Sequence, residues 1–114
     1  MTVNELIKTY PRSRELLQRV KQVVQSLLPD AEIILYGSRA RGDAAPDSDW
    51  DFLVITDQPV SFDLEQQLWH RLYEVEIDIG EVVSAFIKNR DEWQTTVATA
   101  SPYHQSIKKE GMAV

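Results

Sequence analysis

The stretch that decides the fold is Tyr36-Gly37-Ser38-Arg39-Ala40-Arg41-Gly42-Asp43-Ala44-Ala45-Pro46-Asp47-Ser48-Asp49-Trp50-Asp51-Phe52-Leu53-Val54-Ile55. It begins at the end of one apolar run, Ile33–Tyr36, and ends in another, Phe52–Ile55. Both runs are short, continuous and rich in β-branched or aromatic residues, which predicts two buried strands. A Gly-Ser turn, two arginines and a polar loop lie between them.

Two carboxylates, Asp49 and Asp51, stand at the start of the second predicted strand. Residues i and i+2 of a strand point to the same face, so their Cα atoms lie roughly 6.6 Å apart. Two anions this close repel each other unless a cation lies between them. Mg²⁺ prefers oxygen ligands and often binds substrate phosphates as well. The pair alone leaves a second interpretation open, an Asp-rich strand end that is simply solvated.

The Gly-Ser turn adds a second feature beside the carboxylate pair. Gly37 follows the first strand directly and is free to adopt a positive φ. Ser38 is a good N-cap for a short helix that starts at Arg39. Such a turn leaves backbone N–H groups available to a phosphate, although an ordinary strand-to-helix turn has the same local pattern. Together, the turn and the Asp49-Trp50-Asp51 pair predict a phosphate site and a metal site on adjacent strands.

The spacing of these motifs resembles that of a known group of enzymes. Gly37-Ser38, ten intervening residues and Asp49-Trp50-Asp51 resemble the signature of the DNA polymerase β-like nucleotidyltransferase superfamily. The run Gly37–Asp43 and the ending Ile107–Gly111 are similar to its minimal nucleotidyltransferase branch. The resemblance covers roughly residue 16 to the C-terminus. It implies an α/β (α+β) fold, with a small mixed β-sheet and helices packed on one side.

A third strand is expected over Val75–Val83, after a helix that ends near Glu74. Its apolar and acidic residues alternate, and Asp78 lies between Ile77 and Ile79. An acid in the middle of a strand is costly unless it is paired, hydrogen-bonded or bound to metal. In the resembled superfamily a third carboxylate comes from such a strand, and Asp78 fits that position. Glu76 shares its face and is the weaker candidate. We expect helices from Ser84 onward.

The resemblance implies roles for the three carboxylates. Asp49 and Asp51 would bridge two metal ions, and Asp78 would bind the catalytic one and help to remove a proton from the acceptor. Because the chain has no Cys and two His, the site would use oxygen ligands, which favours Mg²⁺, with Mn²⁺ as a second option.

Four residues of the turn are candidates for binding the nucleotide. The backbone at Gly37 and the hydroxyl of Ser38 would hold the β- and γ-phosphates of ATP. Arg39 and Arg41 are open to two interpretations, because either could pair with phosphate or with a nearby acid or helix end.

Composition excludes several other classes of protein. The 114 residues suit a single domain over 1–114, and the net charge of −6 argues against general binding of nucleic acid. Without cysteine there is no disulfide framework. No apolar run approaches the ~18 residues of a membrane span, and the N-terminus has no signal-peptide pattern. We therefore expect a cytoplasmic protein.

The resembled branch also implies a biological setting. Minimal nucleotidyltransferases are often antitoxins that transfer AMP from ATP to a tyrosine of a HEPN-domain ribonuclease toxin. The chain is too short to enclose a large acceptor by itself, which favours a protein acceptor and a hetero-oligomer with that partner. Two alternatives stay open. One is a small-molecule nucleotidyltransferase that works as an oligomer, and the other is a non-catalytic module that masks a toxin by binding it.

Overall fold

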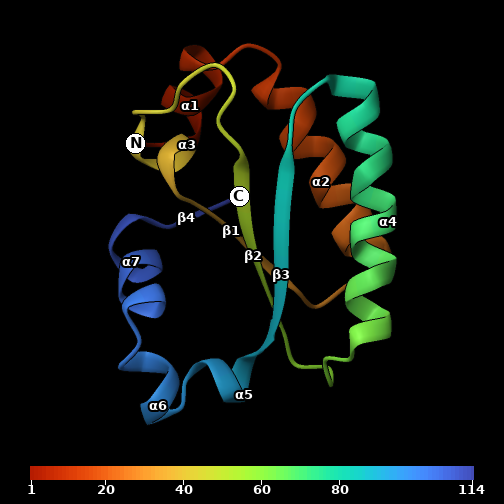
Figure 1. Ribbon diagram of the computed structural model, residues 1–114, viewed down its shortest axis with the longest axis vertical. Helices are drawn as coiled ribbons and strands as arrows, with labels where there is room; N and C mark the ends of the chain where they lie inside the picture. The colour runs from red at the N-terminus through yellow and green to blue at the C-terminus, as the bar shows by residue number, and fades with distance from the viewer.

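A four-stranded sheet lies at the centre of the computed structural model, which describes residues 1–114 (Figure 1). The strands have the order β3-β2-β1-β4. The elements in chain order are α1 Val3–Thr9, α2 Ser13–Leu27, β1 Glu32–Tyr36, α3 Ser38–Arg41, β2 Trp50–Thr56, α4 Phe62–Ile79, β3 Val83–Asn89, α5 Arg90–Trp93, α6 Thr96–Thr99, α7 Pro102–Glu110 and β4 Met112–Ala113.

The sheet is mixed, as predicted. β1 runs antiparallel to both β2 and β4, whereas β2 and β3 are parallel. In this register Asp51 of β2 lies between Tyr36 of β1 and Ser84 of β3. The ends of β1 and β2 that carry the Gly-Ser turn and the acidic pair are therefore adjacent, which the spacing of the motifs required.

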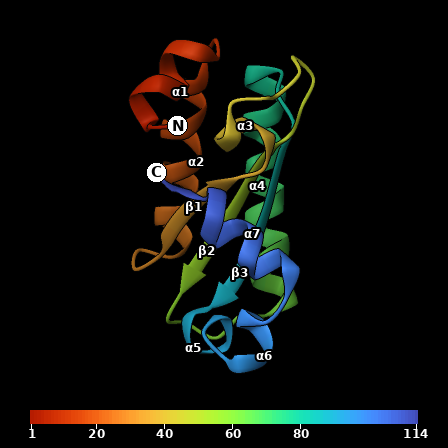
Figure 2. The same ribbon diagram turned by 90° about the vertical axis from the view of Figure 1, so that its left-hand side faces the viewer.

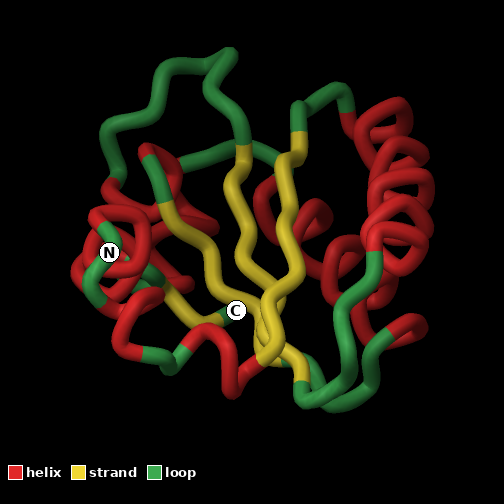
Figure 3. The backbone as a smooth tube through the Cα atoms, turned by 60° about the horizontal axis from the view of Figure 1, so that its bottom comes forward, coloured by secondary structure: helices red, strands yellow, loops and turns green.

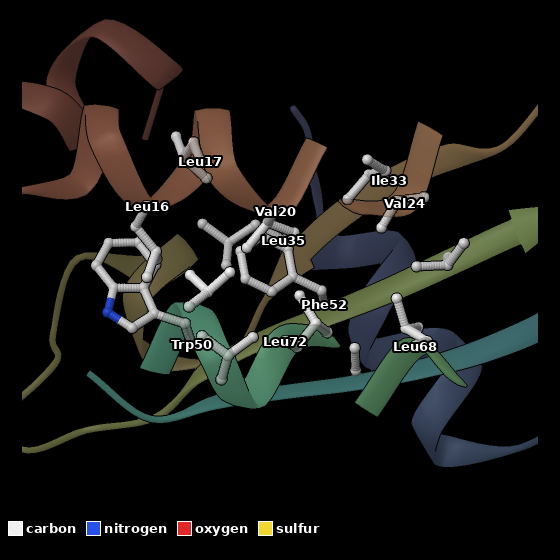
Figure 4. Close-up of a cluster of buried hydrophobic side chains, with 14 of the residues drawn as sticks. Leu16, Leu17, Val20, Val24, Ile33, Leu35, Trp50, Phe52, Leu68 and Leu72 are labelled. Atoms are coloured by element: carbon white, nitrogen blue, oxygen red, sulfur yellow. The ribbon is translucent and has the colours of Figure 1, made fainter. Parts of the chain in front are cut away.

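The long helices pack on one face of the sheet and form the main core with it. Figure 4 shows Phe52 and Trp50 of β2 among leucines and valines of α2 and α4. Burying such side chains stabilises the fold by roughly 1.5–3 kcal/mol each. On the other face, α7 covers part of the sheet, because Ile107 packs against Leu53 and Ile55. Figure 3 shows the strands between helices on both sides.

The predicted third strand over Val75–Val83 is wrong. Residues 75–79 are the last turns of α4, and the strand begins only at Val83. Leu68, Leu72, Val75 and Ile79 are all buried on one side of α4, at the spacing of a helical stripe. Gly80 then ends the helix with φ +81°, the left-handed conformation that suits a glycine after a helix.

The prediction of helices from Ser84 onward is wrong for the first part of that segment, because β3 spans Val83–Asn89. Its residues alternate: Val83, Ala85 and Ile87 are buried against the helices, while Phe86 and Lys88 are exposed on the other face. That alternation is typical of a strand with one buried face.

Several helix starts agree with the capping residues in the sequence. The side chains of Thr2, Ser61 and Ser101 accept hydrogen bonds from the first turns of α1, α4 and α7, which stabilises each helix by about 1 kcal/mol. No helix combines the length and the apolar character that crossing a membrane would require. Figure 2 shows α5 and α6 at the opposite end of the molecule from α1 and the loop between α3 and β2.

Candidate active site

Gly37 brings the turn after β1 close to Asp51, the second residue of the acidic pair. Its φ is +78°, and a Cβ atom at this position would collide with the carboxylate of Asp51. A residue other than glycine would therefore be strained and would displace Asp51. Helix α3 begins at Ser38, one residue earlier than predicted, with Gly37 at the N-cap position. The structure thus places the predicted phosphate turn against the predicted metal pair.

Asp49 and Asp51 repel each other, as their spacing predicted. Asp51 is half-buried and Asp49 is exposed. The pKa of Asp51 is raised, first by burial and then by the negative charge of Asp49, and Arg41 opposes this shift. A carboxylate held this way is stabilised by a cation.

The donor set at this site fits Mg²⁺. Nowhere in the chain do three His, Cys, Asp or Glu side chains form a complete metal site by themselves. Mg²⁺ commonly binds to one or two carboxylates and completes its shell with waters and substrate phosphates. Asp49 and Asp51, beside the Gly37 turn, match that arrangement.

Asp78 does not join the pair, and its predicted place as the third carboxylate is wrong. It lies on α4, is exposed, and pairs with Arg19 of α2 at 3.0 Å. Helices α2 and α4 cover the face of β2 that carries Phe52, so Asp51 points to the opposite face. The position beside Asp51 on β3 is occupied by Ser84, a hydroxyl and not an acid.

Glu76, the weaker candidate for the third acid, has a structural contact. Its carboxylate accepts a hydrogen bond of 2.8 Å from the N–H of Val83. The indole of Trp69 donates to the carbonyl of Ala85 at 2.7 Å. Side chains of α4 thereby satisfy backbone groups on the free edge of β3, which protects that edge from pairing with other strands.

The two arginines of α3 differ in burial, and of the two interpretations left open for Arg39 the structure favours pairing within the protein. The Arg39 side chain is only 4% exposed. Its guanidinium lies 4.8 Å from the ring centres of both Tyr10 and Trp50. It also donates to the carbonyls of Pro46 and Ser48 at 3.2 and 2.9 Å. Arg39 therefore supports the loop that leads to Asp49.

Arg41, in contrast, is half-exposed at the edge of the site. It pairs with Asp43 at 3.2 Å and with Glu110 at 3.0 Å. The hydrogen bond to Glu110, and after it the one to Asp43, raise the pKa of Arg41. Arg41 therefore stays charged at any physiological pH. Both partners are carboxylates, and a phosphate could replace either of them.

Two tyrosines border Asp51 on the same face of the sheet. The hydroxyls of Tyr36 and Tyr103 lie 3.0 Å apart, and their rings pack edge to face. Burial is the main reason that the pKa of Tyr36 is raised far above its usual value. Both hydroxyls are therefore neutral at physiological pH. Sequence reasoning assigned no role to Tyr103, because its contact with Tyr36 depends on how α7 packs.

A groove lined in part by Asp49 runs along β3. It lies between α4 and β3, has a volume of about 510 Å³, and is lined mainly by apolar side chains. Tyr73 and Phe86 are among them, and Ser84 lies in the same wall. Asp49 is one of the residues that line this groove.

Comparison with known proteins identifies the family. A model of the nucleotidyltransferase domain matches residues 17–110. The chain belongs to the nucleotidyltransferase domain family. The match begins within α2 and ends with α7, so it includes the Gly37 turn and the acidic pair.

Two proteins with similar sequences have related names. A protein of Haemophilus influenzae, named as a probable protein adenylyltransferase, MntA, is 40% identical over 48 residues. That match spans 42% of this chain and 42% of the relative. MJ0604 of Methanocaldococcus jannaschii, also named as a protein adenylyltransferase, is 31% identical over 80 residues, which are 70% of this chain and 73% of the relative.

A solved structure has a fold similar to that of this chain. A crystal structure described as a toxin-antitoxin with AMP-PNP superposes with a TM-score of 0.60. The superposition covers 84% of this chain and 69% of the other, at 16% sequence identity. At this identity the likeness extends to the fold alone, and it confirms the predicted fold class.

Proposed function

We propose that this nucleotidyltransferase transfers AMP from ATP to a hydroxyl group of a protein partner. The observation that carries the proposal is the close approach of the Gly37 turn to Asp51, the second residue of the acidic pair, at the ends of adjacent strands. Membership of the family supports nucleotidyl transfer. The names of both relatives support a protein as the acceptor.

Asp49 and Asp51 would hold the metal, Mg²⁺ by preference and Mn²⁺ as a substitute. When bound, the metal neutralises charge on the phosphate oxygens during transfer. With two carboxylates and no third, the protein offers too few ligands for tight binding of the ion alone. Metal and ATP are therefore expected to bind together, with phosphate oxygens completing the shell around one or two ions.

The ATP phosphates would lie along the turn. We assign the phosphate contacts to the N–H of Gly37, the hydroxyl of Ser38 and the guanidinium of Arg41, because hydrogen bonds from such groups suit phosphate oxygens. The acceptor oxygen then attacks the α-phosphorus. A new oxygen–phosphorus bond forms while the bond to pyrophosphate breaks, and pyrophosphate leaves.

The acceptor would enter through the groove between α4 and β3. Asp49 stands at the end of this groove and is exposed, so its carboxylate can accept the proton that the hydroxyl loses. This assignment replaces the one that the sequence suggested for Asp78. A tyrosine side chain suits the groove, because Tyr73 and Phe86 offer apolar contacts to an aromatic ring.

The partner that we propose is a HEPN-type ribonuclease toxin, modified on a tyrosine and thereby silenced. The resemblance to minimal nucleotidyltransferases suggests this partner, and the toxin-antitoxin described for the structure of similar fold is consistent with it. The net charge of −6 suits association with an RNA-cutting protein, whose own surface should be basic. A hetero-oligomer with the toxin follows from the proposal.

The experiment that tests this proposal is to isolate the protein with its partner from the native cells. The partner is then incubated with purified chain, ATP and Mg²⁺, and its intact mass is measured. We expect one or more added AMP units, carried by tyrosine, and no addition with the Asp51→Asn variant. A partner that stays unmodified, yet is silenced equally by wild type and Asp51→Asn, would show that binding and not transfer is the function.

A further inference from the structure

Glu110 holds two of the donors that the proposed function assigns to phosphate. One carboxylate oxygen accepts a hydrogen bond from the N–H of Gly37 at 3.2 Å. The other pairs with the guanidinium of Arg41 at 3.0 Å. The side chain is 19% exposed. A carboxylate of the chain itself therefore occupies an anion position next to the acidic pair.

The backbone around Glu110 is firmly held. Gly111 follows it, and its N–H donates to the carbonyl of Ile107 at 2.7 Å. A side chain at Gly111 would collide with that carbonyl and with Ile34 of β1. After Gly111, β4 pairs with β1, and Ala113 lies opposite Ile34. Because the main chain is hydrogen-bonded on both sides of Glu110, we expect the carboxylate to leave its position by rotation of the side chain.

We propose that the Glu110 carboxylate occupies the phosphate position of the nucleotide-free protein and must be displaced when ATP binds. This inference rests on the proposed function, because it assumes that phosphate binds at the Gly37 turn. A carboxylate and a phosphate use the same charge-assisted hydrogen bonds, and two anions cannot share one set of donors without strong repulsion.

Displacement has a cost that appears in the affinity for nucleotide. A site that is free in only a fraction of molecules binds its ligand more weakly by that fraction. Removing the carboxylate should therefore tighten binding, unlike removal of a residue that contacts the ligand. If Glu110 instead bound the metal as a third carboxylate, its loss would weaken binding. The two roles thus predict changes of opposite sign.

The test is the equilibrium affinity for AMP-PNP with Mg²⁺ in the wild type, in Glu110→Gln and in a matched control, Asp43→Asn. Asp43 also pairs with Arg41 but has no contact with Gly37. We expect Glu110→Gln to bind about fivefold to tenfold tighter, and Asp43→Asn to change less than about twofold. Glu110→Ala, which also frees the N–H of Gly37, should bind at least as tightly as Glu110→Gln. Thermal unfolding checks that each variant is folded.

An independent readout is the amide resonance of Gly37. In Glu110→Ala it should shift without ligand, because its acceptor is gone, and Asp43→Asn should leave it in place. Unchanged or weaker affinity in both Glu110 variants would overturn the inference while wild-type binding kept the proposed function intact. Equal gains in affinity in the Glu110 variants and in Asp43→Asn would also overturn the inference. Removal of any negative charge near Arg41 would then explain the gains. Failure of the wild type and all variants to bind would reject the proposed function together with this inference.

Discussion

The two faces of strand β2 serve different purposes. On the face covered by α2 and α4, Trp50, Phe52 and Val54 are at most 1% exposed. On the other face Asp51 is half-buried, and the exposed Asp49 directly precedes the strand. Alternation along a single strand therefore separates the residues that stabilise the fold from the residues that we assign to chemistry. Substitutions on the two faces should have separable effects.

The largest effect expected on function comes from the site face. Asp51→Asn keeps the shape of the side chain but removes the charge that would hold the metal. We expect the rate of AMP transfer to fall at least about 1,000-fold, which corresponds to roughly 4 kcal/mol of transition-state stabilisation. Initial rates of nucleotide incorporation into the partner measure this. A loss of less than about tenfold would show that Asp51 is not central to the reaction.

The largest effect expected on stability comes from the opposite face. Phe52 is fully buried, and Phe52→Ala should lower the free energy of unfolding by about 3–5 kcal/mol, because it leaves a cavity in the core. Chemical denaturation followed by circular dichroism measures the change. If Asp51→Asn destabilised the protein as much as Phe52→Ala does, the division between the two faces would be wrong.

A smaller pair of effects compares the two arginines of α3. Arg39→Lys should cost about 2 kcal/mol, because lysine cannot reproduce the stacking on two rings or the hydrogen bonds to the loop carbonyls. Arg41→Lys keeps the charge at a half-exposed position and should change stability by less than about 0.5 kcal/mol. Denaturation midpoints of the two variants give the comparison. Equal losses would contradict the structural role of Arg39.

Asp51→Asn should also make the free protein slightly more stable. The pKa of Asp51 is raised in the folded state, so the folded protein binds this proton more tightly than the unfolded chain. Ionised Asp51 therefore lowers the free energy of unfolding at pH values above its pKa in the folded protein. This loss of stability disappears as the pH falls below its pKa in the unfolded chain, near 4. We expect a gain of at most about 1 kcal/mol at pH 7, after allowance for screening by solvent. Unfolding curves at pH 7 and pH 3.5 should show the gain only at pH 7.

The smallest effect is expected at Asp78, which the structure removes from the site. Its pair with Arg19 is exposed, and such pairs contribute about 0–1 kcal/mol. Asp78→Asn should therefore leave transfer unchanged and stability nearly so, as measured by the same incorporation and denaturation assays. Loss of transfer in a folded Asp78→Asn variant would restore the role that the sequence suggested.

Sequence reasoning succeeded where the deciding interactions are local. The two apolar runs, the glycine turn and the i, i+2 carboxylates lie within one short stretch, and periodicity predicts their faces. It failed over Val75–Val83, because the alternation of Val75, Ile77 and Ile79 with the acids between them also suits a strand. The buried stripe from Leu68 to Ile79 and the glycine at 80 favour a helix that continues, and this longer-range pattern decides the structure.

The rest of the site could not be predicted from local patterns. Glu110 and Gly37 are separated by 73 residues and meet only because β4 pairs with β1. The opposite roles of Arg39 and Arg41 depend on Tyr10 and Trp50 packing around one guanidinium. The ending Glu110-Gly111 was similar to the resembled branch, but its contact with the turn is a property of the tertiary structure.

The most direct test of the account is calorimetric titration of the protein with AMP-PNP. The central claim is that Asp49, Asp51 and the Gly37 turn form one site for metal and nucleotide together. We predict binding when Mg²⁺ is present, little binding after chelation, no tight binding of Mg²⁺ alone, and loss of the signal in Asp51→Asn. Binding of AMP-PNP that persists with chelator and in Asp51→Asn would contradict the claim.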